Sequence, residues 1–215
     1  MVSIKSILSI FLISNLLMTI YLNEYIAHIF FYFSYWGVFT SFLAMYFSIR
    51  AYNYKKNNQA PAVIFTEISI CYNIVIVPVF WTMIAPTEFI KYPKWNGLDL
   101  ATKIHLTTTH TIPIIASLTN IYISKNMVFF PEDWKIMFLG GVVYIYANYL
   151  GTQVEGSPMY PIADWTNVPF TIMCYLSAAV LESFIFYHLA LHIKTAKTLW
   201  EYLNLREYIS QQYLL

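Results

Sequence analysis

The chain is poor in charged residues, which make up 11% of its 215 residues. An ordinary soluble domain carries about 25% charge. A soluble domain of this length could not bury the apolar surface of a chain that is 59% hydrophobic and 19% aromatic. The composition therefore excludes an ordinary soluble domain and indicates a protein of the lipid bilayer. A basic excess is lacking as well, because the net charge is +1, so we expect no nucleic-acid partner.

Cysteine is scarce, which leaves little basis for a disulfide framework. The two cysteines, Cys71 and Cys174, both lie inside apolar runs, where buried thiols are far more common than a disulfide or a metal pair. His188 and His192 are one helical turn apart, but they lie at the end of an apolar run, where a histidine costs little. We therefore expect no metal site and no cofactor.

Six apolar stretches are long enough to cross a hydrocarbon layer of about 30 Å at about 1.5 Å per residue. They predict helices at residues 6–22, 27–49, 62–86, 102–124, 134–150 and 167–193. No internal repeat is visible, and the connections between the stretches are too short to form domains. The prediction is an all-α, polytopic membrane protein in which residues 1–215 form a single domain, a six-helix transmembrane bundle.

Lys and Arg near the ends of the predicted spans indicate the orientation, because cytoplasmic segments keep the excess of positive charge. Only Lys91, Lys94 and Lys103 fall on one side. The other side carries Lys5, Arg50, Lys55, Lys56, Lys125, Lys135, Lys194, Lys197 and Arg206. Both termini are therefore predicted to be cytoplasmic. Apolar residues at near-helical spacing in 195–215 predict a short amphipathic tail at the inner interface.

Polar groups inside the spans are the candidates for function, since an ionisable side chain in hydrocarbon costs several kcal/mol unless it faces protein or water. Glu182 lies too deep to reach the headgroups and needs a partner. His105 and His110 project about 140° apart on a helix, so only one of them can face a small pocket. The remaining polar groups are Glu67 and the hydroxyls of Thr40 and Ser41.

Four short motifs, in order, resemble the androgen-induced membrane protein family. They are "WGVFT" from Trp36 to Thr40, "VFWTMIAPTEFIKYPK" from Val79, a His-Thr pair before Pro113, and Tyr160-Pro161. The resemblance covers most of the chain and rests on the order and spacing of the motifs together. It implies a six-span hydrolase that cleaves fatty acid esters of hydroxy fatty acids within the bilayer.

By this resemblance Thr40 is the nucleophile and a histidine of the fourth span is the base. Aligning the His-Thr dipeptide selects His110, which we favour. A gapless alignment on Pro113 instead matches His105 to an earlier histidine of the family and places Thr108 at the catalytic position. Trp36 and Trp81 are assigned to substrate binding.

The chemistry of such a site makes physical sense apart from the resemblance. A threonine hydroxyl is a poor nucleophile and needs a base within hydrogen-bond reach. We therefore expect Thr40 and His110 to face the same cavity, with their side chains within about 5 Å or joined by one bridging water. Glu182 is a candidate to orient the histidine. A lipid ester shares the bilayer with the enzyme, and the endoplasmic reticulum or plasma membrane is the expected location.

Two other classes fit the same residues. A non-catalytic membrane subunit would use them for helix packing and contacts with protein partners, which the sequence does not identify. A transporter would line a path with them, although broken helices in paired repeats are not evident.

Overall fold

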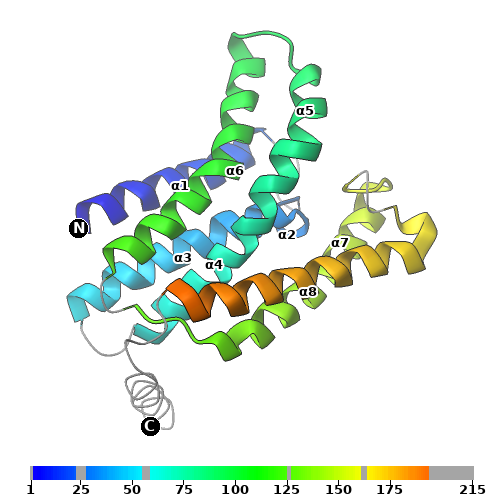
Figure 1. Cartoon of the computed structure of the whole chain (residues 1–215). Helices are drawn as coiled ribbons and strands as arrows, with labels where there is room; N and C mark the ends of the chain where they lie inside the picture. The colour runs from blue at the N-terminus through cyan, green and yellow to red at the C-terminus, as the bar shows by residue number, and fades with distance from the viewer. Residues whose placement is uncertain (1, 23–27, 55–58, 125–126, 161–163, 194–215) are drawn as a thin grey trace.

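The computed structural model describes residues 2–22, 28–54, 59–124, 127–160 and 164–193, and every element within these ranges is a helix (Figure 1). The long α-helices are α1 (Val2–Leu22), α3 (Phe33–Tyr54), α4 (Gln59–Val79), α6 (Gly97–Ile123), α7 (Trp134–Glu155) and α8 (Val168–Ile193). The shorter elements are α2 (His28–Phe31), a π-helix at Phe80–Ile84, α5 (Ala85–Lys91) and 3₁₀ turns at Pro131–Asp133 and Trp165–Asn167. The expected amphipathic tail at 195–215 lies outside the described residues.

Each of the six predicted stretches corresponds to one long helix. The stretch predicted from residue 27 becomes a long helix only at Phe33, and the stretch predicted to end at 86 continues through α5 to Lys91. Three segments are long and apolar enough to cross a membrane, namely Ile4–Leu22, Ala60–Lys91 and Trp165–Leu191. Helices α3, α6 and α7 are less apolar on average than α1, α4 and α8. The apolar segments therefore support a membrane protein, while the number of spans stays a prediction.

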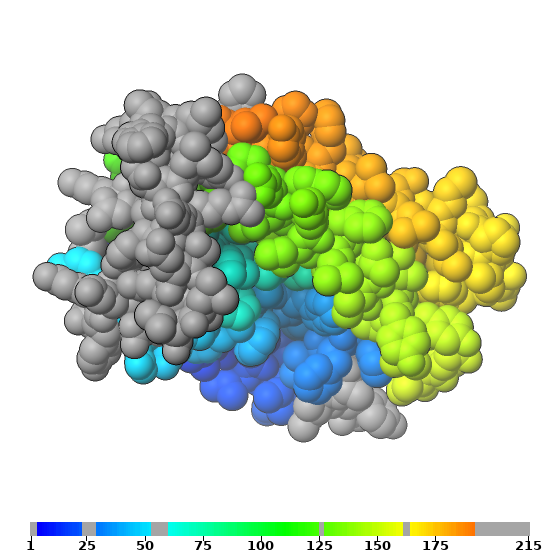
Figure 2. Space-filling model, turned by 90° about the horizontal axis from the view of Figure 1, so that it is seen from below, coloured from blue at the N-terminus to red at the C-terminus, as the bar shows by residue number. Residues whose placement is uncertain are grey.

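Helix α3 lies at the centre of the fold, packed against α1, α4 and α6. Close contact between α3 and α4 depends on Gly37, because a Cβ there would lie 2.7 Å from Ile76 Cδ1 and 2.8 Å from Asn73 Oδ1. Helices α7 and α8 form a pair that joins the rest mainly through α4. The view from below shows this pair on one side of the molecule and α1 with α3 on the other (Figure 2).

Polar side chains in the interior join neighbouring helices by hydrogen bonds. The Ser41 hydroxyl of α3 contacts Ser69 of α4 at 2.6 Å, and Ser69 contacts Ser117 of α6. Nearer the predicted cytoplasmic end, the Asn120 amide donates to the hydroxyls of Ser48 and Thr66, at 2.9 and 2.8 Å. Such bonds satisfy groups that have no water available in a helical membrane bundle.

The backbone changes from α-helix to π-helix at Phe80, two residues after Pro78. Proline has no N–H and so cannot continue the α-helical hydrogen-bond ladder, and wide turns of this kind often occur at functional sites. The π-helix buries Phe80, which is 1% exposed, while its neighbour Trp81 stays 39% exposed. Phe80 is thereby turned toward α6.

Candidate functional site

The structure pairs a serine with one of the two histidines of α6. The Ser34 Oγ atom, on the first turn of α3, lies 2.8 Å from His110 Nε2. Both residues are buried, with 9% and 7% of their surfaces exposed. A serine hydroxyl within hydrogen-bond distance of a histidine nitrogen is the arrangement in which the histidine accepts the proton of a nucleophile.

The other ring nitrogen of His110 fixes which way this bond runs. His110 Nδ1 lies 2.7 Å from the Leu106 carbonyl oxygen, one turn back on α6. A carbonyl oxygen only accepts, so Nδ1 carries the proton, and in the neutral ring Nε2 is left to accept from the Ser34 hydroxyl. The Leu106 carbonyl therefore orients the imidazole as an acid residue does in a catalytic triad.

An aromatic ring covers one face of His110. The Phe80 ring stacks on the imidazole at a centroid distance of 3.5 Å and an interplanar angle of 6°. Phe80 in turn contacts Trp81 and Phe89 edge-on, at 5.3 and 6.3 Å. The stack restricts rotation of the histidine ring and excludes water from that face.

Two tyrosine hydroxyls meet beside Ser34. The Phe33 N–H donates to the Tyr144 and Tyr160 hydroxyls, at 3.0 and 3.1 Å, and the two hydroxyls lie 3.3 Å apart. The Tyr160 hydroxyl also interacts with the Ser34 hydroxyl. Burial raises the pKa of Tyr160, so this phenol stays protonated at neutral pH and can donate a hydrogen bond to an oxygen.

Thr40 lies farther along α3 and is bonded within its own helix. Its hydroxyl donates to the carbonyl oxygens of Trp36 and Gly37, at 2.7 and 3.2 Å. Six residues separate it from Ser34, which places it about 9 Å farther along the helix axis. Within the described part of the chain, no hydrogen bond links Thr40 to a histidine. The structure thus gives His110 a different hydroxyl partner from the one expected.

His105 faces another part of the bundle from His110. Its Nε2 atom lies 3.3 Å from the Thr19 hydroxyl of α1 and 3.4 Å from the Tyr35 hydroxyl. Its Nδ1 atom is buried without a hydrogen-bond partner among the described residues. The two histidines therefore face different neighbours, as their spacing on one helix predicts. Thr108, three residues after His105 and two before His110, accepts a bond from the Asn15 amide.

Glu182 lies on α8 and faces α4 rather than His110. The carboxyl is 4% exposed and its Oε1 atom has no hydrogen-bond partner among the described residues, while it interacts electrostatically with Cys71 and Tyr72. No contact between Glu182 and either histidine of α6 is found in the described ranges. The carbonyl of Leu106, not this acid, contacts the His110 ring.

The two tryptophans assigned to substrate binding lie on different sides of the Ser34–His110 pair. The Trp36 indole N–H donates to the Phe30 carbonyl at 2.9 Å, and its ring meets Tyr144 edge-on at 5.3 Å. Trp81 is 39% exposed and meets Phe89 edge-on at 6.0 Å. Trp36 thus contacts Tyr144, and Trp81 contacts Phe80, the ring that stacks on His110.

Sequence reasoning did not select Ser34 or Tyr160 as site residues. Tyr160 is part of a motif that carries the family resemblance, so the sequence did single it out, but no functional role was assigned to it. Ser34 carries no such signal, and only the packing of α3 on α6 reveals it. The chain matches no protein-family model, no curated protein and no solved structure, so this geometry is the basis on which a function can be argued.

Proposed function

We propose that the protein is a membrane-embedded hydrolase of lipid esters in which Ser34 is the nucleophile and His110 the base. The observation that carries the proposal is the 2.8 Å contact between Ser34 Oγ and His110 Nε2, with Nδ1 held by the Leu106 carbonyl. The resemblance to the androgen-induced family, which implies the same reaction with Thr40 and His110, adds support for the substrate class and keeps Thr40 as the competing nucleophile.

The proposed reaction has two steps, acylation of Ser34 and hydrolysis of the acyl-serine. The Ser34 oxygen bonds to the ester carbonyl carbon while His110 Nε2 takes the hydroxyl proton, and the C–O bond to the alcohol then breaks as His110 returns that proton to the leaving oxygen. Water next gives a proton to His110 and attacks the acyl carbon. The bond from that carbon to Ser34 Oγ then breaks, His110 returns the proton to Oγ, and the fatty acid is released. The Tyr160 hydroxyl donates to the carbonyl oxygen as negative charge develops on it.

The proposed topology is six spans with both termini cytoplasmic, which agrees with the six long helices and the positions of Lys and Arg. Ser34, on the first turn of α3, is then near the outer interface, the level at which the ester groups of amphiphilic lipids lie. Cysteines introduced at Asn57 and Ser157 should react with a membrane-impermeant maleimide from opposite sides of sealed vesicles. Reaction of both from one side would contradict this topology.

The test is covalent labelling of purified protein with a fluorophosphonate probe, followed by peptide mapping. We expect the label on Ser34, and its loss in Ser34→Ala and His110→Ala. Ser41→Ala is the matched control, because Ser41 is also a buried, hydrogen-bonded serine of α3 but contacts Ser69 instead of a histidine. Each variant must elute as a single monodisperse peak to be compared.

The outcomes separate the competing functions. Label that persists in Ser34→Ala and disappears in Thr40→Ala would replace the nucleophile by the threonine of the family resemblance. No label and no ester cleavage in the wild type, with loss of assembly in Ser34→Ala, would favour a non-catalytic subunit. The bond between α3 and α6 would then serve packing, as the Ser41 and Ser69 contact does.

A further inference from the structure

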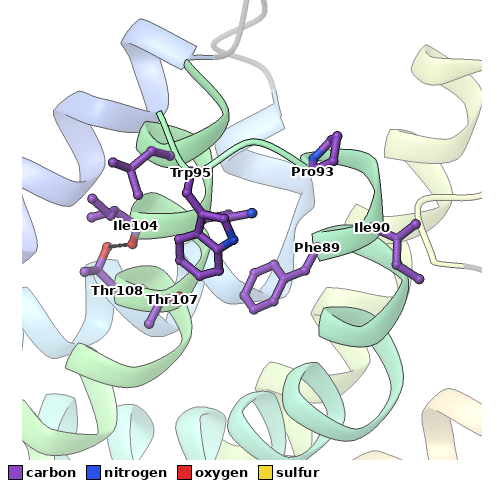
Figure 3. Close-up of a pocket in the computed structure, with 9 residues that line it drawn as sticks. Phe89, Ile90, Pro93, Trp95, Ile104, Thr107 and Thr108 are labelled. Carbon is purple, nitrogen blue, oxygen red and sulfur yellow. Dashed lines mark hydrogen bonds between the residues drawn. The ribbon is translucent and has the colours of Figure 1, made fainter. Parts of the chain in front are cut away.

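A pocket lies between α5 and the first half of α6, and neither Ser34 nor His110 is among the residues that line it. Its volume is about 480 Å³, within the range of about 300–1,000 Å³ usual for small-molecule sites. Its walls are mainly apolar and aromatic, formed by Phe89, Pro93, Trp95, Leu100 and Ile104. Figure 3 shows Trp95 and Phe89 facing one another between the two helices, with Thr107 and Thr108 extending from α6.

A single cationic side chain lines this apolar pocket. Lys103 is only 7% exposed, and its ammonium lies 4.0 Å from the Trp95 ring centroid and 3.2 Å from the Lys94 carbonyl oxygen. No carboxylate pairs with Lys103 in the part of the chain that the structure describes. Burying an unpaired charge is costly, and a carboxylate of a ligand would supply the missing partner.

The position of the pocket suits an amphiphile. Figure 1 shows α5 and the first half of α6 projecting beyond the ends of the neighbouring helices. The connection between them carries Tyr92 and Trp95, residue types that collect where hydrocarbon meets water, together with Lys94. A chain lying in the pocket would thus have its charged end at headgroup level and its tail against apolar side chains.

We infer that this pocket binds an unesterified fatty acid, with its acyl chain against Phe89, Leu100 and Ile104 and its carboxylate paired with Lys103. The occupant carries one negative charge and an apolar chain, because the pocket has one cation and mainly apolar walls. Binding requires no reaction at Ser34, so the inference stands independently of the proposed hydrolysis.

The pocket also connects to the candidate site through α6. Lys103, Thr107 and His110 follow one another at intervals of four and three residues and so share one face of the helix. Phe89, on the opposite wall, contacts Phe80, the ring that covers His110. A fatty acid in the pocket would therefore lie along the face of α6 that leads to the base.

The test measures binding of radiolabelled palmitate and of hexadecanol, its uncharged counterpart, to the full-length protein in nanodiscs. We expect Lys103→Gln to weaken palmitate binding at least about tenfold, because the carboxylate loses its charged partner. Lys103→Arg should restore most of it. Hexadecanol binding should change by less than about twofold in both variants, because it depends on the apolar walls.

Two controls make the outcome decisive. Lys91→Gln removes a lysine of the neighbouring helix that already pairs with Glu88 at 2.6 Å, and it should leave palmitate binding unchanged. Ser34→Ala should also bind palmitate normally, which separates binding from hydrolysis. Palmitate binding that is equal in wild type and Lys103→Gln would overturn the inference. So would competition by dioleoylphosphatidate as strong as that by palmitate, since the site would then accept any lipid anion.

Discussion

Replacing Tyr160 by phenylalanine separates a catalytic role of its hydroxyl from a structural one. The hydroxyl accepts a bond from the Phe33 N–H at 3.1 Å, but the same N–H also donates to the Tyr144 hydroxyl at 3.0 Å. Removing the Tyr160 oxygen therefore leaves no backbone donor unpaired. The free energy of unfolding should fall by only about 1 kcal/mol, the contribution of one hydrogen bond whose donor keeps another partner.

The effect on turnover should be much larger. Loss of one donor to a developing oxyanion lowers kcat by about 10²–10³-fold, equivalent to about 2.7–4 kcal/mol of transition-state stabilisation. The assay is hydrolysis of a long-chain p-nitrophenyl ester by purified Tyr160→Phe, beside thermal unfolding of the same sample. KM should change little, because the hydroxyl acts mainly in the transition state.

The matched variant is Tyr144→Phe, because Tyr144 shares the Phe33 N–H but no interaction with Ser34 is found for it in the described ranges. It should keep kcat within a few-fold. A Tyr160→Phe enzyme that retains kcat within twofold of wild type, while Ser34→Ala is inactive, would refute Tyr160 as the oxyanion donor. Equal losses in both tyrosine variants would instead indicate a general effect on packing at the start of α3.

Two further predictions concern the bundle. Gly37→Ala should lower the free energy of unfolding by about 1–3 kcal/mol, measured in detergent with a chemical denaturant. The added Cβ would lie 2.8 Å from the Oδ1 atom of Asn73, whose amide is held by hydrogen bonds to the Ser41 hydroxyl and the Ser69 carbonyl oxygen. An unaffected Gly37→Ala would contradict the tight α3–α4 contact. Glu182→Gln should leave ester hydrolysis within about twofold of wild type, because the Leu106 carbonyl and not Glu182 contacts the His110 ring. A large loss of kcat in Glu182→Gln with normal stability would restore Glu182 as the group that orients the base.

The positions of the long helices were predictable because each apolar run has the length and composition of a helix. The start of α3 and the division between α4 and α5 were less accessible. Pro78 lies inside an apolar run that looks continuous in the sequence. The π-helix that follows it depends on how the backbone rearranges its hydrogen bonds around the proline, which the sequence pattern does not report. Sequence patterns report how much of a segment is apolar, whereas such local irregularities depend on the helices packed beside it.

His110 was easier to select from the sequence as a candidate residue than the hydroxyl that it contacts. A histidine inside an apolar run is conspicuous, since few ionisable residues occur there. The partner depends on how α3 is rotated and shifted against α6, and no residue of either helix reveals that register. Ser34 and Thr40 are about 120° apart around α3 as well as six residues apart along it, so they face different neighbours.

The local structure at the start of α3 explains why Ser34 and not Thr40 reaches the histidine. Within a helix, a serine or threonine hydroxyl readily bonds the carbonyl one turn back, and Thr40 does so with Trp36 at 2.7 Å. For Ser34 the corresponding carbonyl belongs to Phe30, which precedes the break between α2 and α3 and already accepts the Trp36 indole N–H at 2.9 Å. The Ser34 hydroxyl therefore has no bond to its own helix and donates across to His110 Nε2. A hydroxyl next to a helix start is thus a better candidate nucleophile than one in a helix interior, because it has less to give up before it can react.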